Sequence, residues 1–177
     1  MLLSKIPVLD KGYVALIDSC NTTSKLREIG AEFYGGEYPT SLESLGSMTL
    51  VMKCPLFFLL HLSKFNLKVI DANTSRELDA YIPNPGEVGA PERLDSEAIS
   101  DDIARTTDAL IINPRAYQAD GADRFVSQLT TPINVYTQII VSGSYSEWCS
   151  LAFAEKLPGP IKAYTTAIEQ IITTEWK

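Results

Sequence analysis

The sequence is poor in the residues that build metal, disulfide and hydrolytic sites. Its 177 residues include one histidine and three cysteines, and the cysteines (Cys20, Cys54 and Cys149) are widely spaced without a Cys-x-x-Cys pair. This pattern disfavours a zinc site or a disulfide framework and is typical of reduced thiols in a cytosolic protein. Neither a Gly-x-Ser-x-Gly elbow nor a glycine-rich phosphate loop occurs. We therefore expect a cytoplasmic protein without a metal site, and the residues identify no catalytic nucleophile.

Basic residues are in the minority, and long apolar runs are missing. The chain has 15 Lys and Arg against 22 Asp and Glu, which gives a net charge of −7. This balance argues against broad nucleic-acid binding, which needs an extended basic surface. Lys53, His61 and Lys64 interrupt the longest apolar stretch, so we expect no membrane-spanning helix. The length and the 45% hydrophobic content predict one globular domain over residues 1–177.

Hydrophobic periodicity predicts mixed α and β structure. Period-two alternation predicts strands at Gly12–Ser19, which would open the fold, at 48–53 and at Val135–Ser142. Helical spacing and capping signals predict helices after Thr40, at Leu56–Leu62, over 91–113, from Ser144 to about Leu157 and over 161–176, with a further short helix near 123–128. A polar tail is expected after Leu62, and an extended segment at 81–86. The strands are too few for a doubly wound sheet.

Positive charge is concentrated in the segment from Met48 to Arg76. Four basic residues lie there (Lys53, Lys64, Lys68 and Arg76) against one acid, Asp71. In a chain that is acidic on average, this is the first place to look for a site that binds an anion.

Three collinear segments resemble the flavin-dependent thymidylate synthase family. They are Lys53-Cys54-Pro55-Leu56-Phe57, Tyr81-Ile82-Pro83-Asn84-Pro85 and Pro132-Ile133-Asn134-Val135-Tyr136-Thr137, and the likeness spans roughly residues 40 to 170. The resemblance implies an α+β fold in which a small, bent, mixed or antiparallel sheet is packed by helices. It also implies a homotetramer whose active sites are built where subunits meet.

The family signature has an Arg-His-Arg triad, seven residues, a Ser and then an Arg two places later. Aligned without gaps, the triad falls on Lys64, Phe65 and Asn66, the Ser on Thr74 and the last Arg on Arg76. The resemblance therefore implies that Lys64, Phe65 and Asn66 bind the flavin. Lys64 keeps a charge but not a bidentate fork, Phe65 offers a flat ring, and Asn66 offers an uncharged amide.

Four residues take the positions that hold the nucleotide in the family. Thr74 keeps a hydroxyl and Arg76 is a true match, while Gln138 and Glu155 stand where the family has arginines. A carboxylate at Glu155 would suit a base edge that carries an amino group, such as that of cytosine.

The function implied by the resemblance is methylation at C5 of a pyrimidine deoxynucleotide, dUMP or a relative. FAD reduced by NADPH would supply the hydride, and methylenetetrahydrofolate would supply the carbon. Two alternatives stay open. The chain is a non-catalytic homologue that keeps the fold as a binding or scaffold protein, or the three-segment likeness is accidental and the domain is unrelated.

Overall fold

The computed structural model describes residues 4–20, 32, 46–74, 79–87, 95–120 and 131–175. These ranges contain five strands: β1 (Ser4–Val8), β2 (Gly12–Cys20), β3 (Ser47–Pro55), β4 (Lys68–Thr74) and β5 (Tyr136–Ser144). They also contain the helices α2 (Leu56–Leu62), α3 (Ser96–Ala119), α5 (Tyr145–Ala152) and α6 (Gly159–Glu175) and the short 3₁₀ turn η2 (Pro85–Glu87). None of the helices in the described part of the chain is long and apolar enough to span a membrane.

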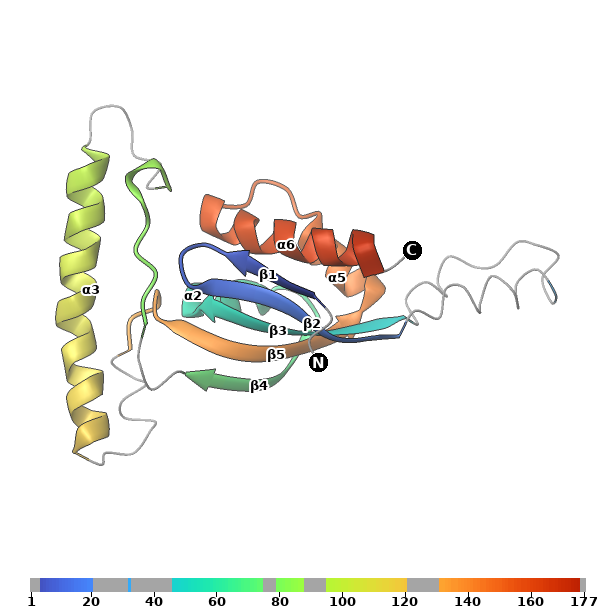
Figure 1. The fold of residues 1–177 in the computed structure, drawn as a ribbon, viewed down its shortest axis with the longest axis horizontal. Coiled ribbons are helices and arrows are strands. Elements are labelled where there is room, and N and C mark those ends of the chain that lie inside the picture. The colour runs from blue at the N-terminus through green and yellow to red at the C-terminus, as the bar shows by residue number, and fades with distance from the viewer. Residues whose placement is uncertain are drawn as a thin grey trace.

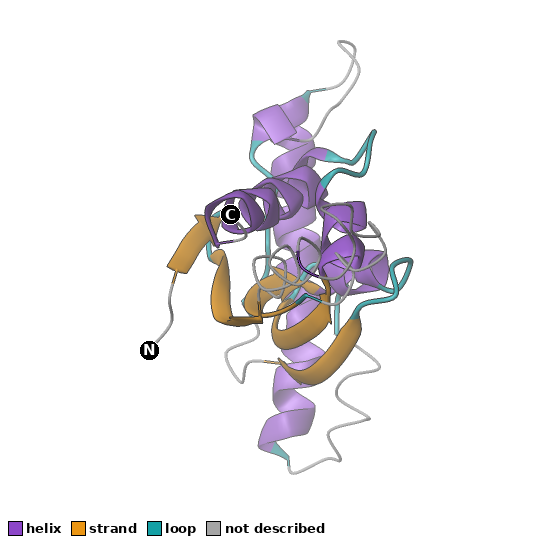
Figure 2. Cartoon of the chain, turned by 90° about the vertical axis from the view of Figure 1, so that its right-hand side faces the viewer, coloured by secondary structure: helices purple, strands orange, loops and turns teal. Residues whose placement is uncertain are grey.

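The five strands form one sheet in the order β1-β2-β3-β5-β4, and every neighbouring pair is antiparallel. The register shifts between Leu16 and Asp18 in β2 and between Val69 and Asp71 in β4. Extra residues of this kind bend a strand and increase its twist, and the strands curve strongly in the side view (Figure 2). The expected small, bent α+β sheet packed by helices is confirmed, and its pairing is antiparallel.

One face of the sheet is covered by helices and forms the core. Figure 1 shows α5 and α6 lying along this face. Alternating residues of β2, β3 and β5 point into it and are fully buried: Val14, Leu16, Leu50, Met52, Ile139 and Val141. Trp148 of α5 is also fully buried, and its indole N–H donates to the Met48 carbonyl at 2.9 Å. Burial of such side chains stabilises the fold by about 1.5–3 kcal/mol each.

Helix α3 lies beyond the end of the sheet rather than on either face (Figure 1). It is attached to the 79–87 segment and to the loop before β5: the Ser100 hydroxyl donates to the Pro83 carbonyl at 2.6 Å, and Ile111 packs with Val135. Leu110 and Ile112 on the same helix are 48% and 64% exposed. The helix is therefore held by a narrow strip of contacts and keeps much of its apolar surface open.

Two strands depart from the sequence prediction. Gly12–Ser19 does not open the fold, because β1 precedes it, and the expected polar tail after Leu62 contains β4. The two strands that the prediction missed, β1 and β4, are the edge strands of the sheet. Edge strands are short or polar and need only one apolar face, so they give little hydrophobic signal.

Three helix boundaries also differ. The helix predicted over 91–113 runs instead from Ser96 to Ala119 and continues past Pro114, while residues 91–94 lie outside the described ranges. The helix predicted to reach Leu157 ends at Ala152, and Lys156 then adopts a positive φ of 56°. The last helix begins at Gly159, because Pro160 suits a first turn, where its missing N–H has no partner. The helices expected after Thr40 and near 123–128 also fall outside the described residues.

Candidate functional site

Polar side chains gather at one end of the face of the sheet that lies opposite α5 and α6. Lys53 of β3 pairs in register with both Tyr13 of β2 and Gln138 of β5, so the three residues lie side by side across the strands. The Gln138 amide donates from Nε2 to the Tyr13 hydroxyl at 2.8 Å. Within the described ranges, no group donates to Gln138 Oε1. We call Tyr13, Lys53, Asp79, Tyr136 and Gln138 the sheet-end cluster.

Lys53 of this cluster and the neighbouring Lys11 both form ion pairs with Asp79. Lys53 Nζ lies 2.8 Å from Asp79 Oδ2, and Lys11 Nζ lies 3.6 Å from Asp79 Oδ1. The hydrogen bond from Lys53, together with the two positive charges, holds the pKa of the Asp79 carboxyl below its usual value. Asp10 adds a second negative charge at the same end. A third lysine, Lys5, lies with its Nζ 4.2 Å from the centre of the Tyr13 ring, so the net charge of this region is small. Since Lys53 is already paired with Asp79, the Gln138 end of the cluster suits an uncharged polar ligand edge better than a phosphate.

Tyr136 is the most deeply buried residue of the cluster. It is fully buried, and its hydroxyl donates to Asp10 Oδ1 at 2.5 Å. Burial, and then the bond to Asp10, raise the pKa of the phenol. Tyr164 of α6 reaches the same strands from the core side, where its hydroxyl donates to the Lys53 carbonyl at 2.8 Å. Both phenols stay protonated at neutral pH and act as donors. Tyr136 links β5 to the turn between β1 and β2, and Tyr164 links α6 to β3.

The signature residues lie at the opposite end of the sheet. Lys64, Phe65 and Asn66 form the turn between α2 and β4, next to the start of α5. Asn66 Nδ2 donates to Glu147 Oε1 at 2.8 Å, and the Phe65 ring lies 5.5 Å from the His61 ring. The Lys64 side chain is exposed. Two of the three residues therefore make contacts within the chain.

This turn does not fit the pyrophosphate of FAD. The backbone bond from Ser144 N, followed by bonds from the Ser144 hydroxyl and Asn66, lowers the pKa of Glu147, so its carboxylate is charged. The turn also follows the C-terminal end of α2, whose carbonyls disfavour anions. In residues 63–68 the positive charge comes from Lys64 and Lys68, neither of which has the bidentate fork of an arginine.

The predicted nucleotide-binding residues are only partly brought together. Thr74 ends β4 and pairs with Thr137, directly beside the pairing of Asn73 with Gln138. Thr74 and Gln138 therefore reach the same end of the sheet. Glu155 is exposed in the bend after α5, on the helical side, and Arg76 lies outside the described residues. Within one chain, Glu155 and the signature turn are separate from Thr74 and Gln138.

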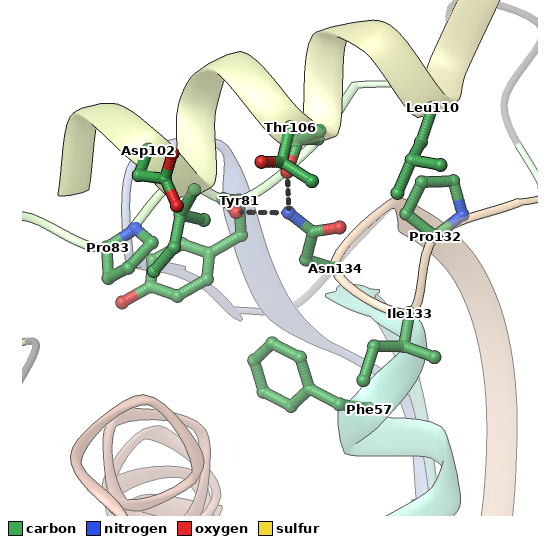
Figure 3. A pocket seen from close by; sticks show the side chains of 11 residues that line it. Phe57, Tyr81, Pro83, Asp102, Thr106, Leu110, Pro132, Ile133 and Asn134 are labelled. Carbon is green, nitrogen blue, oxygen red and sulfur yellow. Dashed lines mark hydrogen bonds between the residues drawn. The ribbon is translucent and has the colours of Figure 1, made fainter. Parts of the chain in front are cut away.

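An apolar groove of about 560 Å³ opens beside α3. Figure 3 shows Phe57 and Ile133 on one wall, Leu110 and Thr106 of α3 on the other, and Tyr81 between them. Tyr81 is 4% exposed, and its ring meets the Phe57 ring edge-on at 6.0 Å. Its hydroxyl donates to Glu87 Oε2 at 3.1 Å.

Sequence reasoning did not find the groove or most of the sheet-end cluster. Gln138 was predicted by alignment, but its partner Tyr13 is 125 residues away in sequence. The groove joins residues from α2, the 79–87 segment, α3 and the loop before β5. The local signals were the three segments of the family resemblance, which supply Lys53 and Tyr136 to the cluster. The same segments supply part of the groove: Phe57, Tyr81, Pro83, Pro132, Ile133 and Asn134.

Comparison with known proteins gives a fold match. No family model matches the sequence, and no curated protein matches it. The solved structure of the UMP/dUMP methylase PolB from Streptomyces cacaoi, bound with 5-Br dUMP, matches with a TM-score of 0.64 and 16% identity, covering 96% of this chain and 92% of that chain. The structure of the same methylase bound with 5-Br UMP matches with a TM-score of 0.64 and 15% identity over the same shares. At this identity the likeness establishes a shared fold.

Proposed function

We propose that this chain binds a pyrimidine nucleotide and that methylation of the ring at C5 is the reaction it serves. The observation that carries the proposal is the fold match to a UMP/dUMP methylase over 96% of the chain. A likeness of fold does not transfer an activity by itself. The groups at the sheet-end cluster supply the second line of support.

The sheet-end cluster suits the edge of a pyrimidine ring. The Gln138 carboxamide combines an N–H donor with an acceptor, and its Nε2 donates to the Tyr13 hydroxyl, which leaves Oε1 as the end turned away from Tyr13. The open Oε1 atom accepts from the N3–H of uracil or from the amino group of cytosine. Thr74 reaches the same end of the sheet. We assign Gln138 to the base, because the neighbouring Lys53 is already paired with Asp79.

The other parts of the site are proposals from the resemblance. Arg76 and Glu155 are proposed to approach the nucleotide, and a homotetramer is proposed because one chain leaves Glu155 and the signature turn apart from Gln138. Methylenetetrahydrofolate is the proposed carbon donor. The resemblance also proposes FAD and NADPH as the source of the hydride. The turn at Lys64, Phe65 and Asn66 does not fit the FAD pyrophosphate, so no residue of this turn is assigned to flavin binding.

Calorimetry with dUMP, UMP and dCMP tests nucleotide binding. We expect saturable binding of at least one of them, weakened about 3- to 10-fold in Gln138→Ala by the loss of one hydrogen bond. Ser142→Ala is the matched control: Ser142 lies on the same strand and the same face, where its hydroxyl accepts from Thr49 at 3.1 Å. Equal weakening in both variants would contradict the assignment of Gln138.

A non-catalytic homologue is the second candidate, favoured by the contacts of the signature turn. Asn66 donates a hydrogen bond to Glu147, and the Phe65 ring packs near the His61 ring. Both side chains therefore stabilise the turn itself. A colourless protein that binds dUMP but forms no methylated product with methylenetetrahydrofolate, FAD and NADPH supports this candidate. Methylated product, detected by mass spectrometry, supports the enzyme.

A further inference from the structure

The groove beside α3 contains a hydrogen-bond acceptor with a fixed direction. Asn134 Nδ2 donates to the Tyr81 carbonyl at 3.0 Å and to Thr107 Oγ1 at 2.9 Å. A carbonyl can only accept, so the amide nitrogen must face Tyr81 and the amide oxygen must face the other way. Figure 3 shows this oxygen turned toward Pro132 and Leu110. No group in the described ranges donates to it.

The walls around this oxygen are aromatic and aliphatic. Phe57 and Tyr81 present two rings in an edge-on arrangement, and Leu110 and Ile133 stand at the mouth with 48% and 62% of their surface exposed. The volume of about 560 Å³ lies within the range of about 300–1,000 Å³ that is usual for small-molecule sites. Nearby charge is already paired, because Asp102 accepts from Arg105 at 2.5 Å.

We propose that this groove binds a planar heteroaromatic ring that carries a ring N–H donor. The ring packs against Phe57 and Tyr81, where aromatic contacts add about 0.5–1.5 kcal/mol beyond area burial. Its N–H donates to Asn134 Oδ1. Nucleobases, pterins and indoles share this chemistry. The groove adjoins the sheet-end cluster, since Tyr136 N donates to the Asp79 carbonyl and Tyr81 N to the Asn134 carbonyl, but no residue of the cluster lines it. The proposal therefore rests on a different set of side chains from the proposed nucleotide function.

Indole and 1-methylindole form the first test, because they share a ring system and differ in the N–H group. We expect indole to bind the full chain in an NMR titration and 1-methylindole to bind about 3- to 10-fold more weakly, the effect of one hydrogen bond. Equal affinities would overturn the proposal, and so would the absence of indole binding. Uracil and pterin, titrated into Gln138→Ala so that the proposed nucleotide site does not contribute, distinguish a nucleobase from a pterin as the natural source of the ring.

A pair of variants on one helix provides the matched control. Leu110→Ser removes an apolar contact from the groove, whereas Ile112→Ser alters a more exposed apolar residue of α3 that does not line it. We expect indole affinity to fall several-fold in Leu110→Ser and to stay unchanged in Ile112→Ser. An equal loss of indole affinity in the two variants would overturn the assignment of the binding site to the groove. Gln138→Ala, which alters the nucleotide site, should leave indole binding unchanged, so that failure of one proposal is distinguishable from failure of the other.

Discussion

The contact between Asn66 and Glu147 allows a quantitative test of the role of the signature turn. Glu147 Oε2 accepts from Ser144 N at 2.7 Å, while Ser144 Oγ accepts from Glu147 N at 3.4 Å, so the two residues form the capping box of α5. Asn66 adds a third bond at 2.8 Å to the same carboxylate. If the turn is structural, removal of Asn66 should destabilise the fold through Glu147.

The magnitude follows from the exposure of the two side chains. A hydrogen bond is worth about 0.5–1.5 kcal/mol net, and because Asn66 is exposed we expect Asn66→Ala to lower the free energy of unfolding by about 0.5–1 kcal/mol. Glu147→Ala removes this bond and the cap, which is worth about 1 kcal/mol alone. The double variant should therefore cost less than the sum of the two single variants, with a coupling of about 0.5–1 kcal/mol.

Urea denaturation of the four proteins measures this coupling. Ser63→Ala is the control, because Ser63 lies in the same turn and its hydroxyl donates to the Leu60 carbonyl at 2.7 Å rather than to Glu147, and it should show no coupling to Glu147→Ala. Strict additivity of Asn66→Ala and Glu147→Ala would refute a structural role for Asn66. It would also reopen the turn as a ligand site.

Three further changes test the core, the sheet-end cluster and the histidine. Gly12→Ala should destabilise by about 1–3 kcal/mol, because its Cβ would lie 2.0 Å from the Tyr164 hydroxyl oxygen; unchanged stability in urea would contradict the packing. Tyr136→Phe removes the bond to Asp10 and should cost about 1 kcal/mol, and a thermal melt that matches the parent protein would argue against that bond. Burial and then the charge of Lys64 lower the pKa of His61 below 6.5, so the unfolded chain binds the proton more tightly; stability should fall as pH drops below 6.5, by more in the parent protein than in His61→Asn, and equal slopes would contradict this account.

Sequence patterns predicted the parts of the fold that depend on neighbouring residues. The capping box at Ser144 and Glu147 needs residues three apart, and the structure has both of its hydrogen bonds. The central strands alternate because their core face is more apolar than the opposite face. That pattern predicted 48–53, which lies within β3, and 135–142, which lies within β5 apart from its first residue. Each of these features depends only on residues that are close together in the sequence.

Features that join distant segments could not be predicted in this way. The edge strands β1 and β4 owe their pairing to the central strands rather than to their own hydrophobicity. The bond between Gln138 and Tyr13 spans 125 residues, and the Asn134 amide is oriented by Tyr81 and Thr107 from two other segments. Alignment placed Asn66 in a ligand site, whereas in the fold its amide donates to the carboxylate of a residue 81 positions away in sequence. Spacing alone does not reveal what a side chain contacts.

Calorimetric titration of dUMP into the full chain, with UMP and dCMP in parallel, tests the central claim most directly. The account predicts saturable binding of a pyrimidine nucleotide that is weaker in Gln138→Ala and unchanged in Ser142→Ala. The absence of binding for all three nucleotides by a folded protein would contradict it.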